Sequence, residues 1–186
     1  MGRKHDATHA RIVREASRLF RERGTEDVGV EEVMDAAGLT RGGFYAHFKS
    51  KDALVAEAVS LGFEDGKTNL FGIPENEGAP WLEHAARRYL AESHIDAVGD
   101  GCIVAALGPE MARRKGLARN AFDRGLAEVI DGVRVRLGKE LGGQKPGRAP
   151  ALFASWVGAL QAARLVRNRT AAVELLNAAR RASLNT

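Results

Sequence analysis

Cysteine and long apolar runs are scarce in this sequence, and their scarcity excludes several classes of protein. The 186 residues include a single cysteine, Cys102, so the chain can form neither an internal disulfide framework nor a zinc site built from several cysteines. No apolar run approaches the roughly 18 residues that a membrane-spanning helix requires. The N-terminal residues also lack the apolar stretch of a secretory signal. We therefore expect a cytoplasmic protein with no membrane partner.

The residue patterns of common enzyme active sites are missing as well. The five histidines form no HExxH motif and no cluster with carboxylates, and no glycine-rich phosphate-binding loop follows a strand pattern. These absences predict that the protein is not an enzyme, that it has no catalytic residues and no metal site, and that it needs no cofactor.

Charge is unevenly distributed along the chain, although the formal net charge is only +4. Residues 53–110 contain three Lys or Arg and ten Asp or Glu, whereas residues 111–186 contain fifteen and five. The acidic middle argues against a nucleic-acid surface that runs along the whole chain. We expect most of the basic excess after residue 110 to lie on a solvated face.

Helical periodicity extends over most of the chain. In residues 7–23 the apolar residues between Ile12 and Phe20 recur at the spacing of one helix face, and Gly24 suits the end of that helix. Similar patterns predict helices at 30–37, about 40–48, 50–63, 80–96, 102–141 with a break near Lys115 and Gly116, 149–168 and 170–183. Loops are expected at 71–80 and 141–150. No alternating strand pattern occurs, so the predicted fold class is all-α.

The stretch LTRGGFYAHFKSK, residues 39–51, has two adjacent glycines in a segment that is otherwise patterned as a helix. Each glycine costs a helix interior about 0.8–1 kcal/mol relative to alanine. With the preceding helix and a turn at Gly38, the segment fits a helix-turn-helix, whose second helix enters the major groove of DNA. Without Cβ atoms, Gly42 and Gly43 would let the backbone approach DNA, while Phe44 and Phe48 anchor the inner face. A glycine pair in an ordinary turn, next to aromatic core residues, is the alternative explanation.

The string AAGLTRGGFYAHFKSKDALV, preceded by an amphipathic helix that ends in LFRERG, resembles the DNA-binding domain of tetracycline-repressor-like (TetR) transcriptional regulators over residues 8–60. The resemblance implies a homodimer. Each subunit would have an N-terminal three-helix helix-turn-helix domain, here residues 1–52, and a larger C-terminal helical domain for ligand binding and dimerisation, here residues 53–186. Members of the family mostly repress transcription at a palindromic double-stranded DNA operator, and a small-molecule effector releases the DNA.

The resemblance also implies which residues contact DNA. Thr40, Tyr45, His47 and Lys51 match phosphate-contacting positions, and Arg41, Gly42 and Gly43 match positions near base edges. The family usually has Ser or Thr in the region where this chain has Gly29. Gly29 can still begin the second helix, but a hydroxyl contact with phosphate is lost. We expect no direct phosphate contact from Glu31, because its side chain is acidic.

Effector-binding residues are expected among the aromatic and other apolar side chains of the helices between Leu61 and Leu126. The candidates are Phe63, Phe71, Trp81, Tyr89, His94, Cys102, Leu107, Met111 and Phe122, with His84, His94 and Glu110 as candidate polar anchors. Such side chains at helical spacing are more often core residues. Their composition predicts a small, mainly apolar effector. Cys102, near a helix N-terminus, could sense oxidants or electrophiles, although a buried, unreactive cysteine is the commoner state.

The resemblance places the dimer interface on the last two helices. Small residues in 149–168 would allow close helix approach, with Trp156 and Leu160 as larger interface side chains; the small residues are Ala154, Gly158, Ala159, Ala162 and Ala163. A core within one chain is the alternative for part of this set.

The alternative function is a constitutive DNA-binding protein without ligand control. The roughly 130 residues beyond the DNA-binding domain exceed what dimerisation requires, which favours ligand control.

Overall fold

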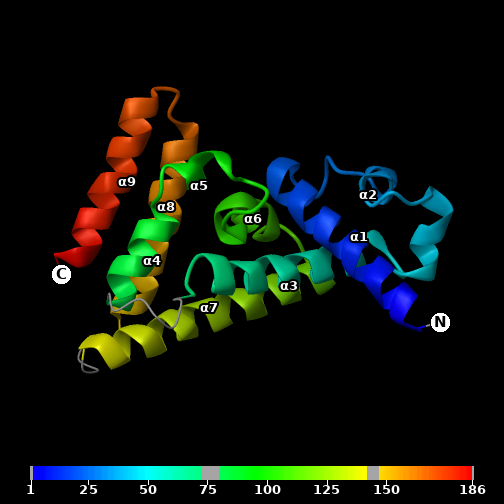
Figure 1. Ribbon diagram of the computed structural model, residues 1–186, viewed down its shortest axis with the longest axis horizontal. Coiled ribbons are helices and arrows are strands. Elements are labelled where there is room, and N and C mark those ends of the chain that lie inside the picture. Colours follow the sequence, from blue (N-terminus) through cyan, green and yellow to red (C-terminus); the bar gives the residue numbers. More distant parts are fainter. Residues whose placement is uncertain (1, 73–79, 142–146, 186) are drawn as a thin grey trace. The chain divides into compact units, whose positions relative to one another are not determined.

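The computed structural model describes residues 2–72, 80–141 and 147–185, and within these ranges its regular structure consists of helices without strands (Figure 1). The elements are α1 (Gly2–Arg23), α2 (Val30–Ala36), the 3₁₀-helix η1 (Arg41–Ala46), α3 (Lys51–Asn69), α4 (Trp81–Tyr89), α5 (Ser93–Asp96), α6 (Ile103–Met111), α7 (Leu117–Leu141), α8 (Arg148–Leu165) and α9 (Arg169–Leu184). The all-α prediction is confirmed. Most of the two predicted loops, residues 73–79 and 142–146, lies outside the described residues.

Two predicted helices differ from the structure. The segment expected at 80–96 is divided into α4 and α5, because the ring of His94 donates from Nδ1 to the carbonyl of Tyr89 at 2.7 Å. In an uninterrupted helix that carbonyl would accept from the N–H of Ser93. The segment expected at about 40–48 is the short 3₁₀-helix η1, as suits a stretch that contains two glycines.

The predicted break in 102–141 is confirmed. α6 ends at Met111 and α7 begins at Leu117, after Gly116, whose φ of +92° lies in the left-handed region that glycine tolerates. The carboxylate of Asp52 accepts a hydrogen bond from the first amide of α7, at 2.8 Å from the nitrogen of Leu117. This bond satisfies one of the unpaired amides that every helix N-terminus presents.

The chain forms two compact units, each built from two segments. Unit 1 comprises Met1–Glu64 and Val98–Gly125, and unit 2 comprises Asp65–Ala97 and Leu126–Thr186. α3 and α7 each contribute residues to both units. The functional boundary that we expect between residues 52 and 53 falls inside unit 1 and stays a prediction.

Unit 1 joins the helix-turn-helix segment to α6 through polar side chains. The carboxylate of Glu110 accepts from the backbone amide of Thr25 at 2.9 Å and from its hydroxyl. Arg114 bonds to Glu110 and to Glu26, and its guanidinium lies 3.8 Å from Asp52. Glu110, predicted as a polar anchor for the effector, is therefore engaged in linking α6 to the end of α1.

Unit 2 is built on the antiparallel pair α8 and α9 (Figure 1), which pack closely along their length. Trp156 of α8 is fully buried, and its indole N–H donates to the hydroxyl of Ser183 at 2.7 Å. Leu160 is fully buried as well. The prediction that these two side chains reach a dimer interface is thus wrong: both belong to the core of their own chain.

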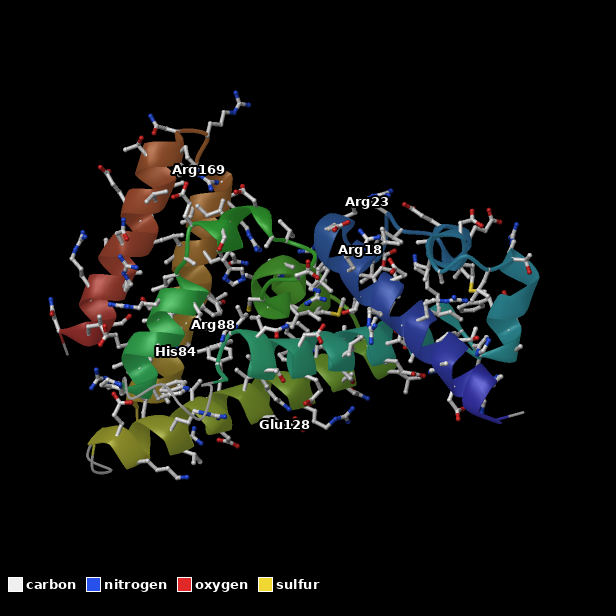
Figure 2. The ribbon with its side chains drawn as sticks, viewed as in Figure 1. Arg18, Arg23, His84, Arg88, Glu128 and Arg169 are labelled. Atoms are coloured by element: carbon white, nitrogen blue, oxygen red, sulfur yellow. The ribbon has the colours of Figure 1, made fainter. Side chains whose placement is uncertain are left out.

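Ion pairs and a side-chain cap hold the start of α9 in place. Arg169 (Figure 2) donates to the carboxylates of Glu92 and Asp96 at 2.8 and 3.0 Å. Asn168 precedes it and accepts from the amide of Ala171, as a side chain at a helix N-cap does.

Among the described residues, no helix is long and apolar enough to cross a membrane.

Candidate DNA-binding surface

The turn between α2 and η1 has the backbone that the sequence predicts. Gly38 has φ +66°, and the amide of Leu39 donates back to the carbonyl of Met34 at 2.9 Å. Such a bond from the residue after a left-handed glycine closes the end of a helix. Gly29 stands at the N-cap of α2, as expected, and contributes no side-chain bond there. The chain therefore leaves α2 sharply and enters η1 from a fixed direction.

Two aromatic side chains anchor η1 to the rest of unit 1, as predicted. Phe44 and Phe48 are 2% and 3% exposed, and their rings stack with centroids 5.5 Å apart. Phe48 also stacks on the ring of His9 from α1, at 4.5 Å. With the apolar side held in this way, the opposite side of η1 faces solvent.

The exposed side of η1 contains four of the predicted DNA contacts: Thr40, Arg41, Gly42 and Tyr45. The side chain of Tyr45 is 80% exposed, which is unusual for so large an aromatic group. Thr40 is the N-cap of η1, but its hydroxyl makes no capping bond. An exposed phenol, hydroxyl and guanidinium within six residues supply the donors that phosphates and base edges accept.

The two glycines of η1 differ in what surrounds them. A Cβ added to Gly42 would meet no heavy atom of the described chain within 4 Å, whereas one added to Gly43 would lie 3.4 Å from Cε of Met34. Neither glycine has a positive φ. A side chain at position 43 would contact Met34 of its own chain, whereas neither packing nor backbone conformation explains a small residue at position 42.

His47 and Lys51 are less exposed than the other predicted contacts. The ring of His47 stacks on that of His5 with centroids 4.3 Å apart, and its Nδ1 is buried without a hydrogen-bond partner among the described residues. Burial lowers the pKa of His47, and the nearby rings of His5 and His9 lower it further. The uncharged form of His47 is therefore favoured in the free protein.

Two features of this surface were not anticipated from the sequence. Arg41 pairs with Glu31 across the turn, with both side chains largely exposed, so the predicted base-contacting guanidinium already has a partner in the free protein. The stack of His5 on His47 joins residues 42 positions apart in the chain. No local periodicity could indicate either contact.

The predicted effector residues are divided between the two units. Unit 1 contains Phe63, Cys102, Leu107, Met111 and Phe122, and unit 2 contains Phe71, Trp81, Tyr89 and His94. All nine are buried. In unit 1, the rings of Phe63 and Phe122 meet edge to face at 5.3 Å. Cys102 is the N-cap of α6 and 5% exposed, so its thiol is not open to solvent.

In unit 2, the predicted residues form an aromatic cluster around Trp156. The ring of Phe71 lies parallel to the indole of Trp156, and Tyr89 lies within 5.7 Å of Phe71 and 5.5 Å of Trp156. The indole N–H of Trp81 donates to the carbonyl of Phe71 at 2.9 Å. These residues form a packed core in unit 2, and their role in effector binding stays a prediction.

Within the described ranges, no group of three or more His, Cys, Asp or Glu side chains is placed to hold a metal ion.

Comparisons with known sequences place the chain among bacterial regulators. The family model described as "Bacterial regulatory proteins, tetR family" matches residues 12–58. Over 165 residues the chain is 26% identical to the HTH-type transcriptional repressor DhaR of Mycobacterium sp. (strain GP1), a match that covers 85% of this chain and 83% of DhaR. The HTH-type transcriptional repressor KstR2 of Rhodococcus jostii (strain RHA1) is 44% identical over 57 residues, which are 31% of this chain and 26% of KstR2.

Solved structures resemble the chain over nearly its whole length. Reduced NemR of E. coli matches with a TM-score of 0.80 at 23% identity, over 96% of each chain. A TetR-family regulator from Agrobacterium tumefaciens matches with a TM-score of 0.78 at 20% identity, over 97% of each chain. AibR, solved with isovaleryl coenzyme A and operator DNA, matches with a TM-score of 0.63 at 17% identity, over 90% of this chain and 94% of AibR. These likenesses establish the fold.

Proposed function

Because the chain belongs to the tetR family of bacterial regulatory proteins, we propose that it is a homodimeric repressor that binds a palindromic operator and is released by a small, mainly apolar effector. That it is a helix-turn-helix transcriptional regulator, and not an enzyme, follows from the family itself. Repression is supported by DhaR and KstR2, both named as repressors. In this proposal the protein acts in the cytoplasm, where bacterial DNA lies.

The DNA contact is assigned to η1 and the start of α3. Thr40, Tyr45, His47 and Lys51 would bond to phosphates, and Arg41 would reach a base edge in the major groove, past the backbone of Gly42 and Gly43. The observation that carries the proposal is the glycine at position 42. It lies on an exposed face, has no positive φ and faces open space, so a close external surface is the reason that remains for a missing side chain.

The homodimer is assigned to the outer faces of α8 and α9. Of the small residues predicted there, Ala154 and Gly158 are exposed, whereas Ala163 is buried within the chain. Exposed apolar side chains add to this face: Leu165 is 83% exposed, and Leu175 and Leu184 are about two-fifths exposed. Apolar surface of this kind on paired helices is typical of an interface between subunits.

Effector control is favoured over constitutive binding by the size of the chain beyond the DNA-binding segment and by its relatives. AibR, of similar fold, was solved with both an acyl coenzyme A and operator DNA, so that protein binds both kinds of partner. A constitutive DNA-binding protein is the second candidate.

The proposal is tested on the purified protein. Light scattering at micromolar concentration should give about twice the 20.0 kDa chain mass. Footprinting on DNA that flanks the gene should protect two half-sites related by a two-fold axis. A monomer, or protection of a single half-site, would contradict the dimeric operator complex. If no compound in a broad panel both raised the melting temperature and weakened operator binding, the constitutive alternative would be favoured, since linkage requires the two effects together.

A further inference from the structure

A small pocket lies in unit 2, where the end of α3 meets the middle of α7. Its volume is about 90 Å³, and its lining residues are Lys67, Phe71, Glu128, Val129, Gly132, Val133 and Arg136. The floor is apolar, because Phe71, Val129 and Val133 are buried. Glu128 marks the position of the rim on α7 in Figure 2. The pocket therefore combines an apolar floor with a charged rim.

The charges of the rim do not balance. The ammonium of Lys67 pairs with the carboxylate of Glu128 at 2.6 Å. Arg136 donates to the backbone carbonyl of Gly132, at 3.4 Å, and no carboxylate of the described residues lies within ion-pair distance of it. Two cations and one carboxylate leave the rim with a net charge of +1, centred on Arg136.

The guanidinium of Arg136 lies beside Gly132, and both residues line the pocket. A Cβ added to Gly132 would lie 3.4 Å from Nη1 of Arg136, in van der Waals contact with the end of that side chain. The planar guanidinium favours a carboxylate because it can donate two parallel hydrogen bonds to it. Arg136 thus presents unused donors beside an apolar cavity.

We propose that this pocket binds a small carboxylic acid, with its short apolar chain on Phe71, Val129 and Val133 and its carboxylate on Arg136. The proposal rests on the proposed function, because it treats the pocket as the effector site. Its volume is below the roughly 300–1,000 Å³ of sites for drug-sized ligands, so the bound part is a chain of a few carbon atoms. The acid-binding group is an arginine on α7, not the histidines or Glu110 expected from the sequence.

The two tryptophans of the chain report on this site. Trp81 bonds to the carbonyl of Phe71, and the ring of Phe71 lies parallel to that of Trp156 with centroids 6.3 Å apart. A ligand that packs on Phe71 changes the surroundings of both indoles. Tryptophan emission therefore measures binding without DNA, so failure of operator binding cannot be mistaken for failure of this proposal.

The probe is butyrate, with butyramide as its uncharged counterpart of the same shape and sodium chloride as the ionic-strength control. Butyrate should change the tryptophan emission of the full-length protein saturably, and butyramide should bind at least about tenfold more weakly, because it lacks the charge that Arg136 pairs. Acetate should bind more weakly than butyrate, since it leaves the apolar floor uncovered.

Three variants locate the site. R136Q should weaken butyrate binding at least about tenfold. R134Q is the matched control, because Arg134 lies on the same helix but pairs with Asp131 outside the pocket, and it should bind as the parent does. G132A should also weaken binding while the melting temperature does not fall, because alanine is the better helix former. This variant separates loss of the site from loss of the fold.

Equal binding of butyrate and butyramide, or equal binding by R136Q and the parent, would overturn the proposal. Butyrate binding that depends on Arg136 but leaves operator affinity unchanged would support the acid site and overturn its role as the effector site. Parallel loss of operator affinity and gain in melting temperature on adding butyrate would support both.

Discussion

The aromatic residues of η1 and those of unit 2 look similar in the sequence but are placed very differently in the structure. In η1, the rings of neighbouring Phe44 and Tyr45 meet edge to face with centroids 5.2 Å apart, yet Phe44 is buried and Tyr45 is 80% exposed. In unit 2, Phe71, Tyr89 and Trp156 pack on one another and are all buried. In unit 2, burial of the aromatic rings stabilises the fold. In η1, burial of Phe44 positions a polar face that remains exposed to a partner.

The largest expected effect tests the buried aromatic cluster of unit 2. Trp156→Ala should lower the free energy of unfolding by about 3–5 kcal/mol, since it leaves a cavity and removes the partner of Ser183. Tyr45→Ala should change it by less than about 0.5 kcal/mol but weaken DNA binding. Urea denaturation at one fixed protein concentration, with operator titration alongside, measures both. Equal destabilisation by the two variants would remove the distinction between the two aromatic groups.

Within the DNA-binding segment, the next effect separates base contact from phosphate contact. Arg41→Ala should cost about 1–3 kcal/mol on the operator and relax base preference at one position in each half-site. Lys51→Ala should weaken operator and random DNA alike and reduce the salt slope by roughly one unit. Titrations of both duplexes at several salt concentrations distinguish the two. A uniform loss with Arg41→Ala would assign that residue to the backbone instead.

A smaller effect concerns pH and the core of unit 2. Burial lowers the pKa of His94, against the raising effect of its bond to Tyr89, and the charge of Arg164 lowers it further. Because the unfolded chain then binds the proton more readily, stability should be complete above about pH 6.5 and fall as the pH drops below that value. His94→Asn keeps a donor for the carbonyl of Tyr89 but cannot titrate in this range, so its stability should depend less on pH. Identical pH profiles in thermal melts would exclude His94 as the source.

The smallest effect concerns the pair that holds Arg41 in the free protein. Glu31→Gln removes the negative charge beside Arg41 and should raise operator affinity, because the guanidinium no longer has to leave a carboxylate. Exposed pairs contribute about 0–1 kcal/mol, so the gain should stay below tenfold. A loss of affinity in the same titration would show that Glu31 itself contacts the DNA favourably.

These two regions also differ in how far the sequence predicts them. The turn at Gly38, the anchors Phe44 and Phe48 and the exposed Tyr45 lie within eleven residues, so local spacing and glycine placement determine them. The cluster around Trp156 joins α4, α8 and Phe71, which follows the end of α3; these parts are far apart in the chain, and no local pattern distinguishes the core residues from ligand-binding ones. For the same reason the contacts of Glu110 with Thr25, and the pocket beside Arg136, were not foreseen.

The exposed face of η1 is the centre of this account, and Gly42 tests it most directly. Gly42→Leu should leave the melting temperature unchanged or slightly higher, because its side chain enters open space, yet weaken operator binding at least tenfold by holding the backbone away from the groove. Gly43→Leu is the matched control: its side chain would contact Cε of Met34, so it should change the melting temperature more than Gly42→Leu does. Should Gly42→Leu bind the operator as tightly as the parent while remaining folded, this face of η1 does not lie against DNA and the proposed contact is wrong.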